Sequence, residues 1–325
     1  MELKVELSYG LNVRNMVLQS EIKKILEKQQ YRFIGNHSLV KICYWTRQSL
    51  SKNIVCFKEK WYPPVESHRC MQITPYFGCN FHCLHCWRLH SGDRPNLIWK
   101  EFPLEETDEP SEIVEKAIDA RKKLLSGFKG NLNVDKNKFE EALKPTMMTL
   151  SLTGESTLYS RISELILEAK KRKMITFLVT NGSMPEVLEN FDALPWQLYV
   201  TLPAPNEKIF LKVCRPLISD GWKRINKTLE LFSSLNCRTA IRLTLVKGLN
   251  MINPKGYAKL IEKTNADFVE CKSYMHVGES QKRLSKEDMP SIEDIRQFTQ
   301  KLSEHIGYTV KDEDTASRVV LLSKE

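Results

Sequence analysis

The chain is predicted to be an α/β protein built on a parallel sheet, because strand-like and helix-like segments alternate along most of its length. Six short apolar runs follow one another from residue 67 onward, and helical spacing of apolar residues appears between them. Repeated βαβ units of this kind form either a full or partial barrel or an open doubly wound sheet. In both cases the active site is expected at the carboxyl ends of the strands.

The predicted elements are bounded by turn and capping residues. The strands are expected at residues 70–75, 146–152, 175–180, 198–202, 240–246 and 267–272. The helices are expected at residues 111–125, 161–171, 222–235, 257–263 and 291–305. Pro110 precedes the first helix, and Asn181-Gly182 ends the third strand. Polar or glycine-bearing segments follow all six runs, so candidate functional groups are predicted at the carboxyl ends of the strands.

The chain divides into two predicted parts. Residues 1–66 are rich in aromatic and basic residues and are expected to form an N-terminal extension packed on the main domain, which covers residues 67–325. No apolar run approaches the roughly 20 residues that a membrane span requires. The first residues have no signal-peptide pattern, so a cytoplasmic protein is expected.

The charge favours a nucleic-acid partner without establishing one. The net charge is +9, from 49 Lys and Arg against 40 Asp and Glu. A basic surface attracts phosphates, although a positive charge of this size is equally compatible with simple solubility.

Cysteine spacing is the most specific signal. Cys79, Cys83 and Cys86 have CxxxCxxC spacing, which is typical of a loop around a 4Fe–4S cluster. Three protein ligands leave one iron of the cluster open to a small molecule. Cys43 and Cys56 and the nearby Cys70 complete a group of six cysteines, and clustered cysteines in a cytosolic chain favour metal over disulfides. Buried thiols and zinc are the alternatives, and the scattered Cys214, Cys237 and Cys271 are expected in the core.

The cysteine loop after a first strand, with Gly154-Glu155 after a second, resembles the radical S-adenosylmethionine (SAM) superfamily. This resemblance implies a partial (βα)6 barrel of the TIM type. It also implies that Cys79, Cys83 and Cys86 hold a 4Fe–4S cluster whose open iron binds SAM, from which a 5′-deoxyadenosyl radical is made.

A longer series of motifs resembles the 4-demethylwyosine synthase family of the wybutosine pathway over roughly residues 40–322. In chain order, these motifs are CMQITP, CNFHCLHCWR, SLTGE, FLVTNG, LYVTLPAP, CRPL, RLTLVKGLNM and YMHVGES. The resemblance implies a lyase that adds two carbons of pyruvate to N1-methylguanosine-37 of tRNA-Phe. It also implies a second 4Fe–4S cluster on Cys43, Cys56 and Cys70. A radical SAM enzyme acting on another RNA or on a small molecule is the alternative.

Further site residues come from the same resemblance. Lys58 is the candidate for a Schiff base with pyruvate, and Lys144, Lys247 and Lys272 are its rivals. The open iron of the second cluster is the other device that would hold pyruvate. Contacts to SAM are expected from Thr153, Gly154, Glu155, Asn181, Thr201, His85, Lys247 and Asn250. The alternatives are a helix N-cap for Glu155, an ordinary loop for Lys247 and Asn250, and a metal-ligand role for His85.

The tRNA side is expected to include Trp87, Arg88, Arg215 and residues 276–283. Aromatic and guanidinium planes stack on exposed bases, and basic side chains bind phosphates. The electron donor is not identified, and a monomer is the simplest assumption.

Overall fold

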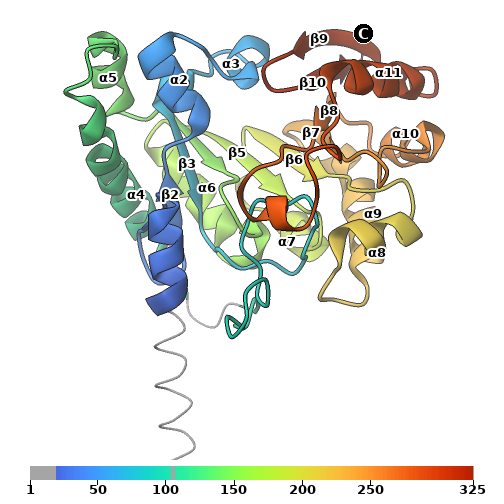
Figure 1. The fold of residues 1–325 in the computed structure, drawn as a ribbon, viewed down its shortest axis with the longest axis horizontal. Coiled ribbons are helices and arrows are strands. Elements are labelled where there is room, and N and C mark those ends of the chain that lie inside the picture. The colour runs from blue at the N-terminus through green and yellow to red at the C-terminus, as the bar shows by residue number, and fades with distance from the viewer. Residues whose placement is uncertain (1–19, 104–106, 325) are drawn as a thin grey trace, which may run out of the picture.

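One sheet of ten strands organises the molecule. The computed structural model describes residues 20–103 and 107–324 (Figure 1). The strand order is β1-β2-β3-β4-β5-β6-β7-β8-β10-β9. Neighbouring strands from β3 to β8 are parallel, and these are β3 (Cys70–Thr74), β4 (Met147–Leu150), β5 (Ile175–Thr180), β6 (Gln197–Thr201), β7 (Arg238–Leu245) and β8 (Phe268–Ser273). The six predicted strands and the α/β class are therefore confirmed.

Antiparallel strands extend both edges of the parallel sheet. At one edge are β1 (Arg32–Phe33) and β2 (Leu39–Lys41), with β2 paired to β3. At the other are β9 (Thr309–Asp314) and β10 (Val319–Ser323), with β10 paired to β8. None of the four was predicted. The β1 and β2 strands are too short for a pattern, and β9 is mostly charged and exposed.

Helices connect the parallel strands. The described helices are α2 (Tyr44–Lys52), α3 (Phe57–Trp61), α4 (Pro110–Leu125), α5 (Lys136–Ala142), α6 (Ile162–Lys171), α7 (Pro185–Glu189), α8 (Glu207–Cys214), α9 (Gly221–Leu231), α10 (Pro254–Glu262) and α11 (Ile292–Ser303), with a further helical segment over residues 20–28. Short 3₁₀ turns are η1 (Ser67–Arg69), η2 (Ser126–Phe128), η3 (Ser156–Leu158), η4 (Phe232–Ser234) and η5 (Gly278–Lys282). The five predicted helices correspond to α4, α6, α9, α10 and α11. No described helix is both long and apolar enough to cross a membrane.

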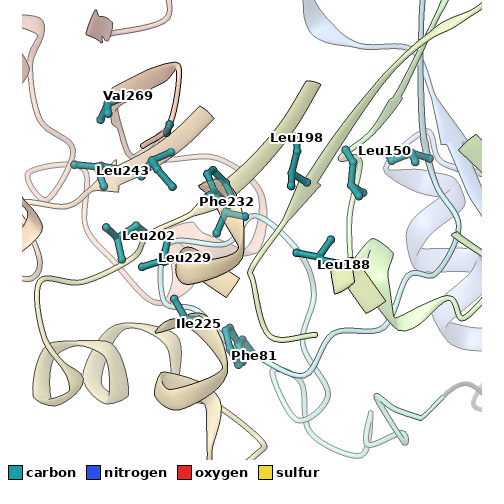
Figure 2. Packing of buried hydrophobic residues seen from close by; sticks show 14 of the residues in the cluster. Phe81, Leu150, Leu188, Leu198, Leu202, Ile225, Leu229, Phe232, Leu243 and Val269 are labelled. Atoms are coloured by element: carbon teal, nitrogen blue, oxygen red, sulfur yellow. The ribbon is translucent and has the colours of Figure 1, made fainter. Parts of the chain in front are cut away.

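The outer face of the sheet packs on the helices. Its buried side chains include Leu150, Leu198 and Leu243 from the strands, with Ile225 and Leu229 from α9 (Figure 2). Because side chains alternate between the two faces of a strand, the residues between them point to the inner face. The largest core cluster of the described residues thus lies between the sheet and its helices.

The inner face carries a second, aromatic core. Phe57 and Trp61 of α3 pack there on Phe177 and Tyr199 of the sheet. The α3 helix also lies beside β9, as Figure 1 shows for the blue and red segments at the top of the view. The Trp61 Nε1 atom donates to Asp312 Oδ2 at 2.8 Å. Residues 20–66 therefore add β1 and β2 to the sheet and place α3 on its inner face, and contacts cross the predicted boundary at residue 66.

Candidate active site

A single cavity of about 340 Å³ lies on the inner side of the sheet. All six clustered cysteines line it, as do the following predicted site residues: Lys58, His85, Thr153, Gly154, Glu155, Asn181 and Thr201. Tertiary structure has therefore brought together thirteen of the fifteen predicted residues. The roles of these residues stay predictions.

The first cysteine triad is on the loop that follows β3. Arg283 holds this loop by donating to the carbonyls of Leu84 (3.3 Å) and Cys86. Arg88 is buried and donates to Glu101 at 2.8 and 3.0 Å. Neither arginine is therefore available to RNA in this structure, so the expectation that they form the tRNA side is corrected. Their guanidinium groups instead fix the backbone around the cysteines.

The sulfur atoms of this loop suit a metal cluster. The Cys79 Sγ atom accepts from the Phe81 N–H at 3.4 Å and from Asn181 Nδ2 at 3.7 Å. All the cysteines are free. Burial raises the pKa of the Cys79 and Cys86 thiols. Three cysteine sulfurs that line one cavity, with N–H donors on Cys79, match the donor set of a 4Fe–4S cluster, whose binding must release the thiol protons.

The second triad reaches the same cavity from the other end of β3. Cys43 and Cys56 are the N-cap residues of α2 and α3, and Cys70 is the first residue of β3. Burial raises the pKa of Cys56 to about 12 and that of Cys70 to about 11. This triad lies at the amino end of β3, so the cavity extends beyond the carboxyl ends of the strands, where the active site was predicted. Its donors also fit a metal cluster.

Lys58 lies between the second triad and the aromatic core. Its Nζ atom is 4.2 Å from the ring centroid of Phe177 and 4.7 Å from that of Tyr199. Burial and then the charge of Arg242 lower the pKa of Lys58. Lysine in such surroundings becomes a nucleophilic amine, because the charged form loses hydration.

Among the rival lysines, only Lys272 lines the cavity. Its Nζ atom donates to the Ser317 carbonyl at 2.6 Å, and burial together with Arg242 lowers its pKa to about 8. Lys247 instead pairs with Asp294 at 2.6 Å, and neither it nor Lys144 is among the lining residues that the structure describes.

Glu155 is buried and heavily hydrogen-bonded. Its Oε1 atom accepts from the Thr157 N–H and hydroxyl and from the Thr180 hydroxyl, while Oε2 accepts from the Asn181 N–H at 2.7 Å. Glu155 is also the N-cap residue of η3, which is the role that the sequence offered as the alternative to SAM binding. A carboxylate oxygen accepts more than one hydrogen bond, so Oε2 retains capacity for a ligand. The structure therefore supports a capping role and leaves room for a binding role.

Gly154 and His85 are two further residues that line the cavity. Gly154 has φ of +67°, and a Cβ atom there would lie 2.2 Å from the Tyr76 carbonyl oxygen. Burial lowers the pKa of His85 to about 4, and its Nδ1 atom has no hydrogen-bond partner among the described atoms. A neutral ring with an unused polar atom suits an incoming heteroaromatic group such as adenine.

The side chain of Asn250 is hydrogen-bonded to the backbone of the loops around it. It is fully buried, its Oδ1 atom accepts from the Val246 N–H, and its Nδ2 atom donates to the carbonyls of Pro203 and Thr244. The cavity lining, as described, contains neither Asn250 nor Lys247. Both hold the segment after β7, in agreement with the ordinary-loop alternative.

The sequence prediction missed Arg242, which lines the cavity, and its partner Glu270. They lie opposite each other on β7 and β8, and Arg242 Nε and Nη2 donate to Glu270 Oε2 at 2.9 and 2.6 Å. The signal that would have found them is a charged residue inside each of two apolar strands, at the inward positions of the alternation.

The sequence matches two family models that together cover most of the chain. Residues 73–261 match the radical SAM superfamily, and residues 263–324 match the model for wyosine base formation. The tRNA 4-demethylwyosine synthase of Pyrococcus horikoshii is 46% identical over 316 residues, which are 96% of this chain and 91% of that protein. The human enzyme is 34% identical, over 95% of this chain and 42% of that protein.

Solved structures of TYW1 match the fold of this chain. The structure of TYW1 with a lysine–pyruvate adduct bound has a TM-score of 0.83 and 36% identity, covering 94% of this chain and 96% of that one. Archaeal TYW1 has a TM-score of 0.76 and 32% identity, with coverage of 94% and 95%. The fold is accordingly of the partial TIM-barrel type, and membership of the superfamily implies a 4Fe–4S cluster and SAM. The chain belongs to the tRNA 4-demethylwyosine synthases, a family of radical SAM enzymes.

Proposed function

We propose that this protein converts N1-methylguanosine-37 of tRNA-Phe to 4-demethylwyosine, using two carbons of pyruvate. The observation that carries the proposal is one cavity lined by two cysteine triads and by Lys58. The names of the relatives support the tRNA reaction, and the lysine–pyruvate adduct in a similar structure supports pyruvate as the second substrate.

In this proposal each triad holds one 4Fe–4S cluster. Cys79, Cys83 and Cys86 bind the first, and Cys43, Cys56 and Cys70 bind the second, with residues 1–66 supplying two of these ligands. When bound, the first cluster and SAM supply a 5′-deoxyadenosyl radical that takes a hydrogen atom from the substrate methyl group. The reducing electron comes from an external donor, and we propose that the protein acts as a monomer.

The chain positions SAM beside the first triad. Glu155 Oε2 is assigned to the amino group of its methionine moiety, because a carboxylate is the natural acceptor for an ammonium group. His85 is assigned to the adenine ring, while Thr153, Gly154, Asn181 and Thr201 line the space between.

Lys58 is assigned to pyruvate. The neutral amine attacks the ketone carbon, the ketone oxygen leaves as water, and a C=N bond joins the substrate to the chain. Among the described residues, the Lys58 Nζ atom contacts aromatic rings and no hydrogen-bond acceptor. Lys272 is bonded to the Ser317 carbonyl. This difference favours Lys58 as the nucleophile.

Arg215 and residues 276–282 stay candidates for the tRNA side, and Trp87 is the candidate that lines the cavity as described. It is 46% exposed, lines the cavity, and its Nε1 atom donates to the Leu152 carbonyl at 3.2 Å. A fixed and exposed indole is a stacking surface for a base turned out of the anticodon loop.

The test uses anaerobically reconstituted protein with SAM, dithionite, pyruvate and tRNA containing N1-methylguanosine. Mass spectrometry of the digested tRNA is expected to detect the tricyclic base. Lys58→Arg is expected to abolish this base while 5′-deoxyadenosine still forms, and Lys144→Arg, which changes a lysine outside the cavity lining, is expected to retain both. Turnover of another RNA or of a small molecule, without any tricyclic base, would contradict the proposal.

A further inference from the structure

Arg242 is held in the cavity by a buried network of Glu270 and two tyrosines. Two of its N–H groups donate to Glu270 Oε2, and the hydroxyls of Tyr62 and Tyr199 donate to Glu270 Oε1 at 2.9 and 3.0 Å. Glu270 has no exposed surface. The network leaves the guanidinium group little freedom to rotate, because one edge is fixed at two points.

The opposite edge of the guanidinium group remains available. The Nη1 atom has no hydrogen-bond partner among the described residues, and it is not among the side-chain atoms sealed from solvent without a partner. Arg242 lines the cavity, so a small ligand can reach this edge. It presents N–H groups of Nη1 and Nη2 side by side, the geometry that arginine uses for a carboxylate.

Arg242 and Lys58 both pack against the ring of Tyr199, which makes them neighbours in the cavity. The Arg242 Cζ atom lies 4.4 Å from the ring centroid of Tyr199, and Lys58 Nζ lies 4.7 Å from the same centroid. Lys272 is a further basic residue of this region, and its Nζ atom lies 5.5 Å from the ring centroid of Phe57. A 2-oxo acid joined to Lys58 through its ketone carbon carries its carboxylate one bond away from that carbon.

We infer that Arg242 binds the carboxylate of the 2-oxo acid held on Lys58 and thereby selects charged 2-oxo acids over neutral ketones. Glu270, Tyr62 and Tyr199 are positioning residues, because they orient the guanidinium group and do not contact the substrate. The inference rests on the proposed function, in which pyruvate forms an imine with Lys58. The competing site for the carboxylate is the open iron of the second cluster.

The experiment measures imine formation separately from the radical reaction. Reconstituted protein without SAM or tRNA is incubated with pyruvate and cyanoborohydride, and the trapped fraction is measured by intact-protein mass spectrometry against pyruvate concentration. For the wild-type protein, pyruvamide, which lacks the negative charge, is expected to need about 10- to 100-fold more ligand than pyruvate for half-maximal trapping, the range that a charged hydrogen bond supplies.

Variants then assign this preference to one side chain. Arg242→Gln is expected to raise the pyruvate concentration for half-trapping by about 10- to 100-fold and to leave trapping of pyruvamide within about threefold. For Arg242→Lys, the pyruvate concentration for half-trapping is expected to lie between those of the wild-type protein and Arg242→Gln, because lysine keeps the charge without the paired N–H groups. Arg238→Gln is the matched control, since Arg238 is on the same strand but packs on the rings of Tyr62, Trp196 and Phe268.

Three results of the trapping experiment would overturn the role of Arg242, and a fourth would also overturn the Lys58 step. Equal losses for pyruvate and pyruvamide in Arg242→Gln would show that Arg242 acts on the fold or on Lys58, and would overturn the inference. Unchanged trapping of pyruvate in a folded variant would place the carboxylate elsewhere and also overturn it. Equal trapping of the two ligands by the wild-type protein would overturn it without any variant. If the wild-type protein traps no 2-oxo acid, the Lys58 step of the proposed function fails as well.

Discussion

Glu270→Gln is expected to destabilise the folded protein strongly, because it leaves the buried guanidinium group of Arg242 without its counter-charge. Glu270 is completely buried, and the side chain of Arg242 is 16% exposed. The substitution keeps the size of the side chain, and the amide oxygen still accepts from Tyr62 and Tyr199. Its amide nitrogen, however, faces two N–H donors of Arg242. Breaking a buried pair in this way costs about 3–5 kcal/mol of unfolding free energy.

The measurement is guanidinium-induced unfolding of the reconstituted proteins under anaerobic conditions, with the unfolding free energy extrapolated to water. The matched control is Glu313→Gln, which removes a partly exposed carboxylate that accepts from Arg296 at 2.7 Å. Since exposed ion pairs contribute little, this control is expected to lose less than about 1 kcal/mol.

A double variant separates lost charge pairing from lost packing. Glu270→Gln with Arg242→Met removes the unpaired charge and keeps an amide oxygen that accepts from the hydroxyls of Tyr62 and Tyr199, so it is expected to recover most of the stability lost in Glu270→Gln alone. A loss below about 1 kcal/mol in Glu270→Gln would refute the reasoning, because the charge of Arg242 would then be compensated by solvent. Failure of the double variant to recover stability would show that the network acts through shape.

Three further outcomes are expected. Cys43→Ala should lower bound iron by about four atoms per chain, whereas Cys237→Ala should leave it unchanged, as iron and sulfide analysis will show. Gly154→Ala should lower the unfolding free energy by more than about 2 kcal/mol in denaturant titrations, because it combines a positive φ with a backbone clash. The unfolding free energy of the wild-type protein minus that of Lys272→Met should rise between about pH 8 and about pH 10.4. These limits are the pKa of Lys272 in the folded protein and the ordinary pKa of lysine.

Proton binding by Lys272 sets the direction of this pH dependence. Below about pH 8 the lysine is protonated in both the folded and the unfolded chain, so the stability difference from Lys272→Met is constant. Above it, only the unfolded chain retains the proton, and raising the pH then favours folding. A flat difference from pH 8 to 10 would contradict the lowered pKa. Likewise, full iron content in Cys43→Ala or unchanged stability in Gly154→Ala would contradict the respective structural argument.

Local patterns were sufficient for the central part of the fold. The six parallel strands were predictable because each is a compact apolar run ended by a turn signal, and their helices because apolar spacing and caps mark them. The edge strands were not predictable, since β2 has three residues and β9 is charged and exposed. Their pairing depends on the neighbouring strand rather than on their own sequence.

The candidate site was predictable where spacing carries chemistry. The loop from Cys79 to Cys86 is such a case, because its three cysteines lie within eight residues. By contrast, Arg242 and Glu270 were not recognised as a pair, because they become partners only when β7 and β8 lie side by side. Arg88 and Arg283 were misjudged for the same reason: sequence shows a charge, and only packing decides whether it faces solvent or a buried carboxylate.

The sequence by itself determined the alternation of strands and helices, the cysteine spacing and the family to which the chain belongs. These properties are local or ordered along the chain, so no knowledge of distant contacts was needed. Only the tertiary structure decided that α3 fills the inner face of the sheet and that the two triads share one cavity from opposite ends of β3. The physical reason is that burial of Phe57 and Trp61 against distant strands fixes where Lys58 and Cys56 lie, and burial is a property of the whole fold.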